Sequence, residues 1–157
     1  MPSCGYRVVG SEPVGVEKTK ATMAVPPFEN RTMQVGLETI FANEMIKALK
    51  DRQVVRVKPG DDKADYILSG SIKSLEHSST AYLDIEQSLI RRATLTVEVT
   101  VKDARSNKII WKDAEIVKTD YVANQYYGAG EALRDQGLRE VSARFAQRIA
   151  DKMSLLF

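Results

Sequence analysis

Hydrophobic and polar residues alternate strictly in one part of the chain, residues 92–103. The apolar positions of this stretch are Leu95, Val97, Val99 and Val101. Threonine, glutamate and lysine stand between them. Because successive side chains of a strand point to opposite faces, the pattern predicts a strand of an antiparallel sheet, with one buried face and one threonine-rich face in water.

A turn and a second apolar run follow this strand. The sequence DARSNK predicts the turn, and residues 109–118 are expected to return beside the first strand as its hairpin partner. Ile109, Ile110 and Trp111 are consecutive apolar residues. The alternation therefore fails at this point, which is compatible with a β-bulge.

Three shorter stretches also have the character of strands. Residues 21–26 end at a pair of prolines, and residues 53–58 end at Pro59-Gly60. Residues 66–75 form the third stretch, and the positions that share one of its faces are Tyr66, Leu68, Gly70 and Ile72. A glycine inside a strand indicates either a bulge or a close packing neighbour.

Two segments have the helical period instead. Residues 34–51 carry one apolar stripe, made of Leu37, Ile40, Phe41, Met45, Ala48 and Leu49. Residues 130–155 predict a long terminal helix, with a stripe made of Leu138, Val141, Phe145, Ile149, Met153 and Leu156. Spacings of three and four residues place each stripe on one side of its helix, where it can pack against a sheet.

The order of these elements predicts an α+β fold. We expect a mixed, mostly antiparallel four-stranded sheet with two α-helices packed on one face. Residues 1–20 contain three glycines and several charges and are expected to be a tether. Residues 21–157 are expected to form a single globular domain, as the total length of 157 residues allows.

The stretch AVPPFENRT, residues 24–32, links the first strand to the first helix. Pro26-Pro27 should end the strand, because proline cannot donate a hydrogen bond to a strand ladder. Phe28 is expected to pack at the corner between strand and helix. Thr32 is a candidate for the N-cap of the helix or a neighbour of it.

Composition and charge exclude several classes of function. The net charge is +2, which is too small to indicate nucleic-acid binding by itself, and the best strand exposes threonine and glutamate where an RNA-binding sheet exposes aromatic rings. One cysteine cannot form an intrachain disulfide. No apolar run approaches about 18 residues, so no transmembrane helix is predicted.

Catalytic chemistry has little support in the sequence. His77 is the only histidine, and no nucleophile-elbow motif accompanies the serines near it. One cysteine and one histidine cannot complete a zinc site, and the aspartates in KPGDDKAD lack the ligand spacing of a calcium loop. No phosphate-binding glycine motif is present. We therefore expect no enzyme activity, no cofactor and no metal.

Basic residues near strand ends are the remaining candidates for a binding site. They are Arg91, Arg92, Lys73, Lys112 and Lys118. Such side chains can bind phosphate groups through charge-assisted hydrogen bonds. The sequence alone favours a second interpretation, in which they are scattered charges that keep the surface soluble.

Cys4 stands in the context Ser3-Cys4-Gly5, which fits the junction at which a bacterial lipoprotein signal is cleaved and the cysteine is lipidated. The basic and apolar regions of a signal peptide do not precede it in this sequence. Cys4 is therefore either a lipid-anchored residue or a free thiol in a tail.

Several segments, taken in order, resemble one family. They are CGYRVVG, VPPFENRT, GLETIFANEMIKAL, ADYILSGSI and LTVEVTVKDARSNKIIW, followed by the long terminal helix. Together they resemble LptE, the lipopolysaccharide-assembly outer-membrane lipoprotein, over almost the whole chain.

The resemblance implies a non-enzymatic lipoprotein. Its acylated cysteine, here Cys4, would anchor it to the inner leaflet of the outer membrane, facing the periplasm, since Gly5 is not a retention residue for the inner membrane. Its domain would plug the lumen of an LptD β-barrel, help to assemble that barrel, bind lipopolysaccharide and assist its transport to the outer leaflet. The resemblance carries over no individual lipopolysaccharide-binding positions; from charge and position, the hypothesis is that the five basic residues named above meet the phosphates of lipid A. The threonine-rich face would suit a polar barrel lumen.

An alternative remains open, because turns like PFEN also occur in periplasmic lipoproteins of the curli-secretion and TolB type. The chain would then be a scaffold that acts by protein–protein assembly, in the curli-secretion case as a ring of identical copies.

Overall fold

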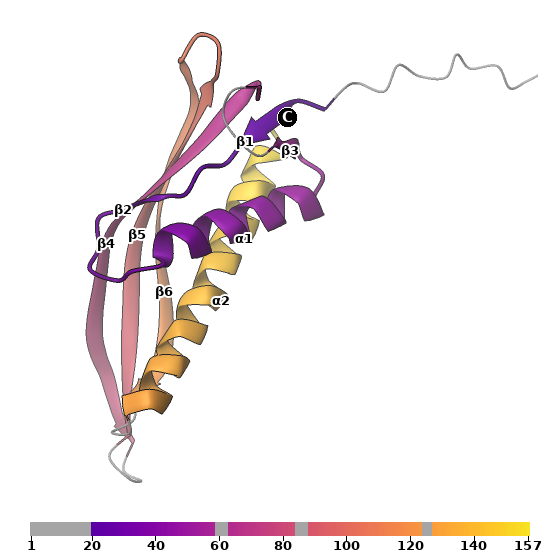
Figure 1. Ribbon diagram of the computed structural model, residues 1–157. Coiled ribbons are helices and arrows are strands. Elements are labelled where there is room, and N and C mark those ends of the chain that lie inside the picture. Colours follow the sequence, from indigo (N-terminus) through magenta and orange to yellow (C-terminus); the bar gives the residue numbers. More distant parts are fainter. Residues whose placement is uncertain (1–19, 59–62, 84–87, 124–126) are drawn as a thin grey trace, which may run out of the picture.

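The computed structural model describes residues 20–58, 63–83, 88–123 and 127–157. Figure 1 shows one sheet with both helices packed against the same face of it. The elements are β1 (Thr22–Ala24), β2 (Glu29–Asn30), α1 (Leu37–Asp51), β3 (Arg56–Lys58), β4 (Tyr66–Leu83), β5 (Ser88–Asp103), β6 (Ile109–Ala123) and α2 (Tyr127–Met153). The predicted α+β fold is thus confirmed. Apart from Lys20, the tether expected over residues 1–20 lies outside the described residues.

The sheet is mixed, with the strand order β3-β1-β4-β5-β6, and β2 also pairs with β4. The three long strands β4, β5 and β6 form an antiparallel meander. β1 pairs in parallel with β3 and with β4, and β2 pairs in parallel with β4. The prediction of four strands was wrong, because the sheet has six. The strand β2 has two residues, which is too few for an alternation to be visible in the sequence, whereas β1 and β3 lie within the predicted stretches 21–26 and 53–58.

The long strands reach further than their apolar patterns indicated. β4 runs to Leu83 and β5 begins at Ser88, so the polar sequence EHSST is part of a strand. Pairing with β5 holds this end of β4, with His77 opposite Ala93 and Ser79 opposite Arg91. The ladder between β5 and β6 shifts register at Val101, which confirms an irregularity beside Ile109–Trp111.

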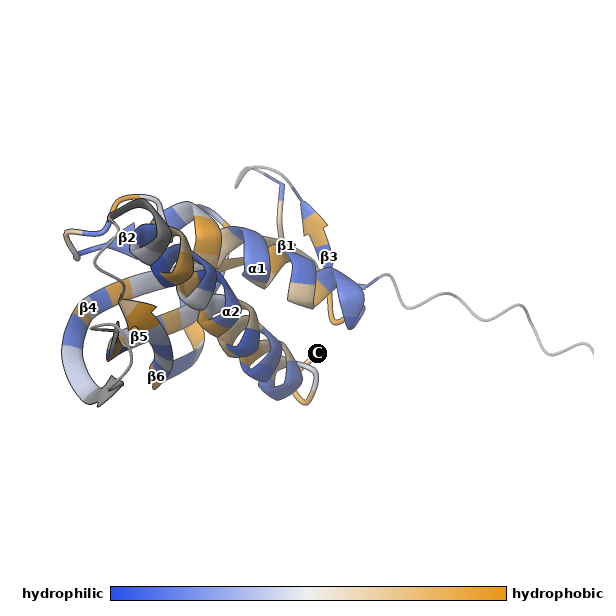
Figure 2. Cartoon of the chain, turned by 90° about the horizontal axis from the view of Figure 1, so that it is seen from below, coloured by the Kyte–Doolittle hydropathy of each residue, from blue (hydrophilic) through white to orange (hydrophobic). Residues whose placement is uncertain are grey.

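The core lies between the sheet and the two helices. Apolar residues gather where the helices meet the sheet, while the outer side of α2 is largely hydrophilic (Figure 2). The alternating residues of β5 are fully buried there together with both predicted helical stripes, except Ile40, which is partly exposed, and Leu156, which lies beyond α2 and is exposed. Phe41 of α1 contacts Phe145 of α2 with 5.6 Å between the ring centres, and this contact joins the helices inside the core.

A second aromatic contact closes the corner between β2 and α1. Phe28 is buried, and its ring centre lies 6.0 Å from that of Phe41. The ring also covers Gly70 of β4, where a Cβ atom would come within 2.2 Å of it. The close neighbour predicted for Gly70 is therefore Phe28, and the predicted corner position of Phe28 is confirmed.

The start of α1 differs from the prediction. The N-cap residue is Gly36, whose φ of 94° is favourable for glycine, and no side chain caps the helix. Thr32 is therefore not the N-cap residue. In the part of the chain that is described, no helix combines the length and apolar character needed to cross a membrane.

Candidate binding surface

One face of the sheet carries no helix within the described part of the chain. Its side chains come from β4, β5 and β6 and lie in rows across the three strands, because the strand registers align them. The rows are Ser69–Thr100–Lys112, Ser71–Glu98–Ala114, Ser74–Thr96–Ile116, Glu76–Thr94–Lys118 and Ser78–Arg92–Asp120. We call this surface the open face.

The open face is rich in hydroxyl groups. The threonines of β5 on this face, Thr94, Thr96 and Thr100, are half-buried by their neighbours rather than by a second layer. A hydroxyl group can both donate and accept a hydrogen bond. The open face can therefore bond to another polar surface without leaving its own groups unpaired.

Charged side chains cross the open face as an alternating series. Arg31 Nε lies 2.8 Å from Glu29 Oε1, Lys73 Nζ lies 3.5 Å from Glu98 Oε1, and Lys112 Nζ lies 3.1 Å from Glu98 Oε2. Glu29 also accepts a hydrogen bond from Ser71 Oγ at 3.2 Å. We call Arg31, Glu29, Lys73, Glu98 and Lys112 the charge ladder. Its three positive and two negative groups sum to a net charge of +1.

The pKa values of the acidic members reflect these partners. The hydrogen bond from Lys112 lowers the pKa of Glu98, and the charge of Lys73 adds to the effect. The hydrogen bond from Arg31 lowers the pKa of Glu29 in the same way, with a further contribution from Ser71. Both carboxylates are therefore ionised at neutral pH and compensate the basic residues beside them.

The lowered pKa of Glu98 predicts a pH-dependent contribution to stability. Because the folded state binds this proton more weakly than the unfolded state, the contribution is complete above the ordinary pKa of 4.5 and is lost as the pH falls through the folded value. We expect the difference in unfolding free energy between the wild type and Glu98→Gln to shrink as the pH is lowered from 7 to about 3. Urea unfolding at several pH values measures it. A difference that stays constant with pH would contradict the role of Glu98, and Lys112→Met should weaken the dependence.

The loop between β2 and α1 is held by the side chain of Asn30. Its Oδ1 accepts hydrogen bonds from Thr32 N at 3.0 Å and from Thr32 Oγ1 at 2.7 Å. Its Nδ2 donates to Gln34 O at 2.7 Å and to Glu38 Oε2 at 2.8 Å. Glu38 Oε2 also accepts from Gly36 N. One amide thus organises the loop and the first turn of α1.

Replacing Asn30 by alanine removes four hydrogen bonds from a partly buried position. We expect Asn30→Ala to lower the free energy of unfolding by about 1–3 kcal/mol, because groups that it paired lose their partners. Denaturant unfolding measures this loss. Asn30→Asp keeps the acceptor for Thr32 and loses the donor to Gln34, so its effect should be smaller unless the charge of Glu38 opposes it. An unchanged Asn30→Ala variant would show that water replaces the amide.

This loop borders a hollow of about 400 Å³ beside β4. The hollow is lined by Arg31, Thr32, Met33, Gln34, Lys73, Ser74, Leu75 and His77. Met33 is fully exposed at its rim, and Val35 is exposed nearby. The surface along this part of β4 is consequently both basic and apolar.

The structure separates the five basic residues of the sequence prediction. Lys73 and Lys112 meet at Glu98 in the charge ladder. Arg92 forms two hydrogen bonds with Asp120, at 2.7 and 2.9 Å, and lines a second hollow with Lys118 and Arg144. Arg91 has the opposite orientation, since it pairs across the sheet with Tyr121 on the helix-covered side. Cys4 lies outside the described residues.

His77 also lies on the helix-covered side, near the end of β4. Its Nδ1 is 3.0 Å from the hydroxyl group of Tyr121. Partial burial and the positive charges of Arg134 and Arg91 lower its pKa. Among the described residues, no group of three or more His, Cys, Asp and Glu side chains is placed to hold a metal ion.

Sequence reasoning missed the acidic half of the open face. Glu98 and Asp120 determine which basic side chains are compensated, yet they are 25 or more positions away from Lys73 and Arg92 in the sequence. The alternation of β5 did place Glu98 on the polar face. The partners of Glu98 are determined by the registers between the strands, and no local sequence pattern reveals these registers.

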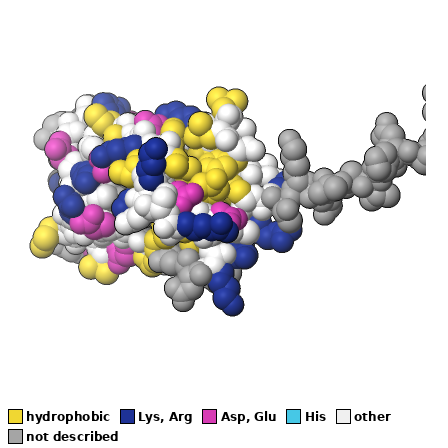
Figure 3. Space-filling model, turned by 90° about the horizontal axis from the view of Figure 1, so that it is seen from above, with side chains coloured by type: hydrophobic (Ala, Val, Ile, Leu, Met, Phe, Trp, Pro, Cys, Tyr) yellow, Lys and Arg dark blue, Asp and Glu magenta, His cyan; other side chains and the backbone are white. Residues whose placement is uncertain are grey.

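Charges of both signs also occur side by side at the end of the molecule where β1 and β3 lie (Figure 3). This mixture agrees with the small net charge of +2. In the view of Figure 3, basic residues do not gather into one continuous patch.

Comparison with known proteins gives one family. The family model described as "LptE: Lipopolysaccharide-assembly" matches residues 21–153. No curated protein matches the sequence.

Solved structures share the fold at low sequence identity. A point variant of PelC from Paraburkholderia phytofirmans, solved as a dodecamer, is 13% identical with a TM-score of 0.57, over 86% of this chain and 90% of that one. A minor lipoprotein from Acinetobacter baumannii is 13% identical with a TM-score of 0.52, over 87% and 92%. Lipoprotein GNA1162 from Neisseria meningitidis is 13% identical with a TM-score of 0.50, over 78% and 98%. At such identities the likeness shows the fold alone.

Proposed function

Since the chain belongs to the LptE family of lipopolysaccharide-assembly proteins, we propose that it plugs an LptD-type outer-membrane β-barrel and that the open face is its main contact with the barrel wall. In this role it helps to assemble the barrel and assists the insertion of lipopolysaccharide into the outer leaflet. The observation that carries the proposal is the absence of any covering layer, within the described residues, on the polar side of β4, β5 and β6.

The chemistry of the open face suits a barrel lumen. The interior of a large membrane β-barrel is polar, so a plug must offer hydrogen bonds rather than apolar contacts. The serine and threonine hydroxyl groups of the open face supply donors and acceptors. The apolar side of the same strands is already covered by the helices. The charge ladder is internally paired, which reduces the cost of removing its members from water.

Lipopolysaccharide binding is proposed for the basic side chains. Phosphate groups of lipid A are anionic and accept charge-assisted hydrogen bonds from arginine and lysine. Lys73 and Lys112 both form an ion pair with Glu98, and the charge ladder as a whole keeps a net positive charge. Arg92 and Lys118 lie beside a second hollow of about 540 Å³, although Asp120 and Glu140 also line it. Arg91 supplies a further positive group at the same end of β5.

Co-purification tests the barrel role. The chain and its LptD-type partner are produced together, and the mass of the complex is measured by light scattering after size exclusion. One copy of each protein is the expected result. Thr96→Trp, in the middle of the open face, should reduce the yield of complex, while Gln147→Trp on the exposed side of α2 should not. A closed ring of many identical copies would contradict the plug and support the scaffold alternative.

Lipopolysaccharide binding is tested separately with the purified domain. Arg91→Ala combined with Arg92→Ala should weaken binding, and Arg139→Ala, which removes an exposed positive charge from α2, serves as the matched control. An affinity unchanged by the double substitution would exclude these two residues as contacts. Lys73→Ala, Lys112→Ala and Lys118→Ala are tested in the same assay.

The lipid anchor is proposed for Cys4. Cys4→Ser should move the protein, expressed with a lipoprotein signal, from the outer-membrane fraction to the soluble periplasmic fraction. A membrane location that survives this substitution would show that another contact anchors the chain.

A further inference from the structure

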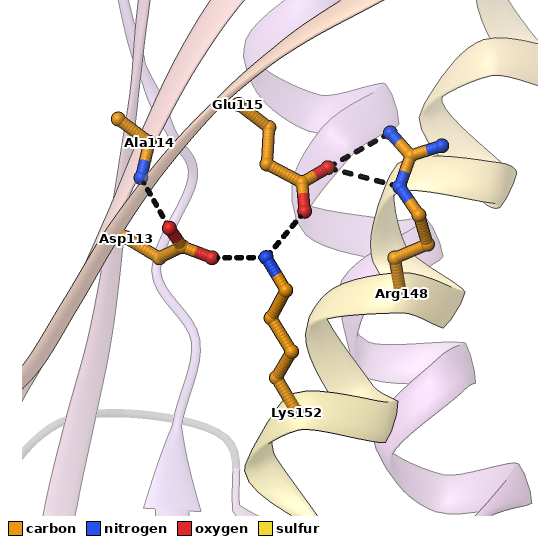
Figure 4. A network of polar contacts seen from close by, with 5 residues as sticks. All are labelled: Asp113, Ala114, Glu115, Arg148 and Lys152. Carbon is orange, nitrogen blue, oxygen red and sulfur yellow. Dashed lines mark hydrogen bonds and ion pairs between the residues drawn. The ribbon is translucent and has the colours of Figure 1, made fainter.

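β6 is the last strand of the sheet on the meander side and pairs only with β5 among the described strands. It is 15 residues long, from Ile109 to Ala123. Alternate residues of an edge strand direct their backbone N–H and C=O groups away from the sheet, which makes such an edge a template for another strand. Ala114 donates its N–H to the carboxylate of Asp113 (Figure 4). The even-numbered residues from Lys112 to Asp120 direct their side chains to the open face.

The helix α2 covers the inner face of β6. Lys152 Nζ lies 2.5 Å from Asp113 Oδ2 and 2.7 Å from Glu115 Oε1, and Arg148 Nε donates to Glu115 at 2.9 Å (Figure 4). These contacts fix β6 and neutralise its inner carboxylates.

The apolar side chains of β6 on the other face have no such cover. Ile116 is 65% exposed and Val122 is 36% exposed. Ile110, which has no partner on β5 because the ladder shifts register there, is 45% exposed. A long edge strand with exposed apolar residues is a surface that pairs readily with another strand.

The sequence of β6 is complementary to itself. We propose that β6 pairs antiparallel with β6 of a second copy of this chain, centred on Ile116. In this register Ile116 faces Ile116 of the second copy, Lys112 faces Asp120, and Ile110 faces Val122. Two of these pairs are apolar and one joins opposite charges, whereas Ala114 faces Lys118, whose charge gains no partner in this register.

Two other antiparallel registers between β6 and β6 of the second copy fit less well. Centring the pair on residue 115 sets Lys112 against Lys118, which places like charges opposite each other. Centring it on residue 117 sets Lys112 against Val122 and Asp120 against Ala114, which leaves both charges without a partner. Among these three registers, only the one centred on Ile116 sets Lys112 against Asp120 and also opposes apolar residues to each other.

The charges of the sheet support the same arrangement. Lys112 already bonds to Glu98 of β5, and Asp120 already bonds to Arg92. If Lys112 of one copy faces Asp120 of the other, positive and negative side chains alternate across the open faces of both copies. Because β6 contributes the same surface to both sides, the contact has two-fold symmetry and closes at two copies.

Cysteine trapping tests the register on the free chain, with neither a barrel nor lipopolysaccharide present, so its outcome is independent of the proposed function. In a Cys4→Ser background, Ile116→Cys should form a disulfide-linked dimer under mild oxidation. A mixture of Lys112→Cys and Asp120→Cys chains should form the mixed dimer. Thr96→Cys lies in the same row as Ile116 but on the central strand β5, and it should not cross-link.

Analytical ultracentrifugation of the wild-type chain, with no introduced cysteine, tests whether the dimer forms. Ile116→Lys should weaken the dimer at least about tenfold, because it sets two positive charges opposite each other at the centre. Met33→Lys changes an exposed apolar residue of the β2–α1 loop and should leave the dimer intact. A wild-type chain that stays monomeric at all concentrations, a dimer that Ile116→Lys leaves unchanged, or assemblies larger than two would each overturn the proposal.

Discussion

Replacing Phe41 by alanine is expected to lower the free energy of unfolding by about 3–5 kcal/mol, because the substitution removes a fully buried ring and leaves a cavity. Phe41 contacts Phe28 at the corner before α1 and Phe145 on α2, with ring centres 6.0 and 5.6 Å apart. It therefore joins the loop, both helices and the sheet. Denaturant unfolding followed by circular dichroism measures the loss.

Two variants make this test specific. Phe41→Leu keeps most of the apolar volume and should have a much smaller effect than alanine. Phe157→Ala removes a ring that is 40% exposed beside Tyr66, so its effect should also be smaller. If Phe41→Ala were no more destabilising than Phe157→Ala, the aromatic contact between the helices would not be central to the core.

Replacing Gly70 by alanine is the second large effect that we expect. The new Cβ would lie 2.2 Å from the ring of Phe28, far inside van der Waals contact, so either the ring or strand β4 has to move. Overpacking of this kind costs typically about 1–3 kcal/mol and occasionally more. Denaturant unfolding should show a lower midpoint with an unchanged slope, as expected for a loss of stability without a change in compactness.

A compensating substitution distinguishes overpacking from other causes. Phe28→Leu removes the atoms that collide, so the double variant Gly70→Ala/Phe28→Leu should be more stable than the sum of the two single losses predicts. Gly137→Ala in α2 is the control, because its nearest contact would be the flexible side chain of Thr119 at 3.3 Å. Additive losses in the double variant would show that Gly70 is needed for another reason.

The elements with long periodic patterns could be predicted from the sequence. The alternation in residues 92–103 and the two helical stripes each describe a surface that must be buried, and the structure buries all three, apart from Ile40 and Leu156. The strand β2 could not be predicted in the same way, whereas β1 and β3 lie within the stretches 21–26 and 53–58 that the sequence indicated as strands. β2 pairs with β4 over two residues, and a backbone pairing this short leaves no trace in the choice of side chains.

Local side-chain chemistry was predicted less well than burial. Thr32 has the composition of a helix cap, yet α1 starts four residues later at Gly36. Asn30 takes the organising role instead, because it reaches Thr32, Gln34 and Glu38 at once. These partners become neighbours only when the loop folds back over the first turn of the helix.

For the candidate surface, the sequence by itself determined which side chains are polar, which strand faces point to water and where the basic residues occur along the chain. The tertiary structure alone decided that Lys73 and Lys112 share Glu98 and that Arg92 is held by Asp120. The physical reason is that the periodicity of a strand fixes the side of the sheet that a residue faces, whereas the register between strands fixes its neighbours. Register depends on contacts between segments that are distant in the sequence, including the bulge at Ile72, which shifts the rows of β4 against β5.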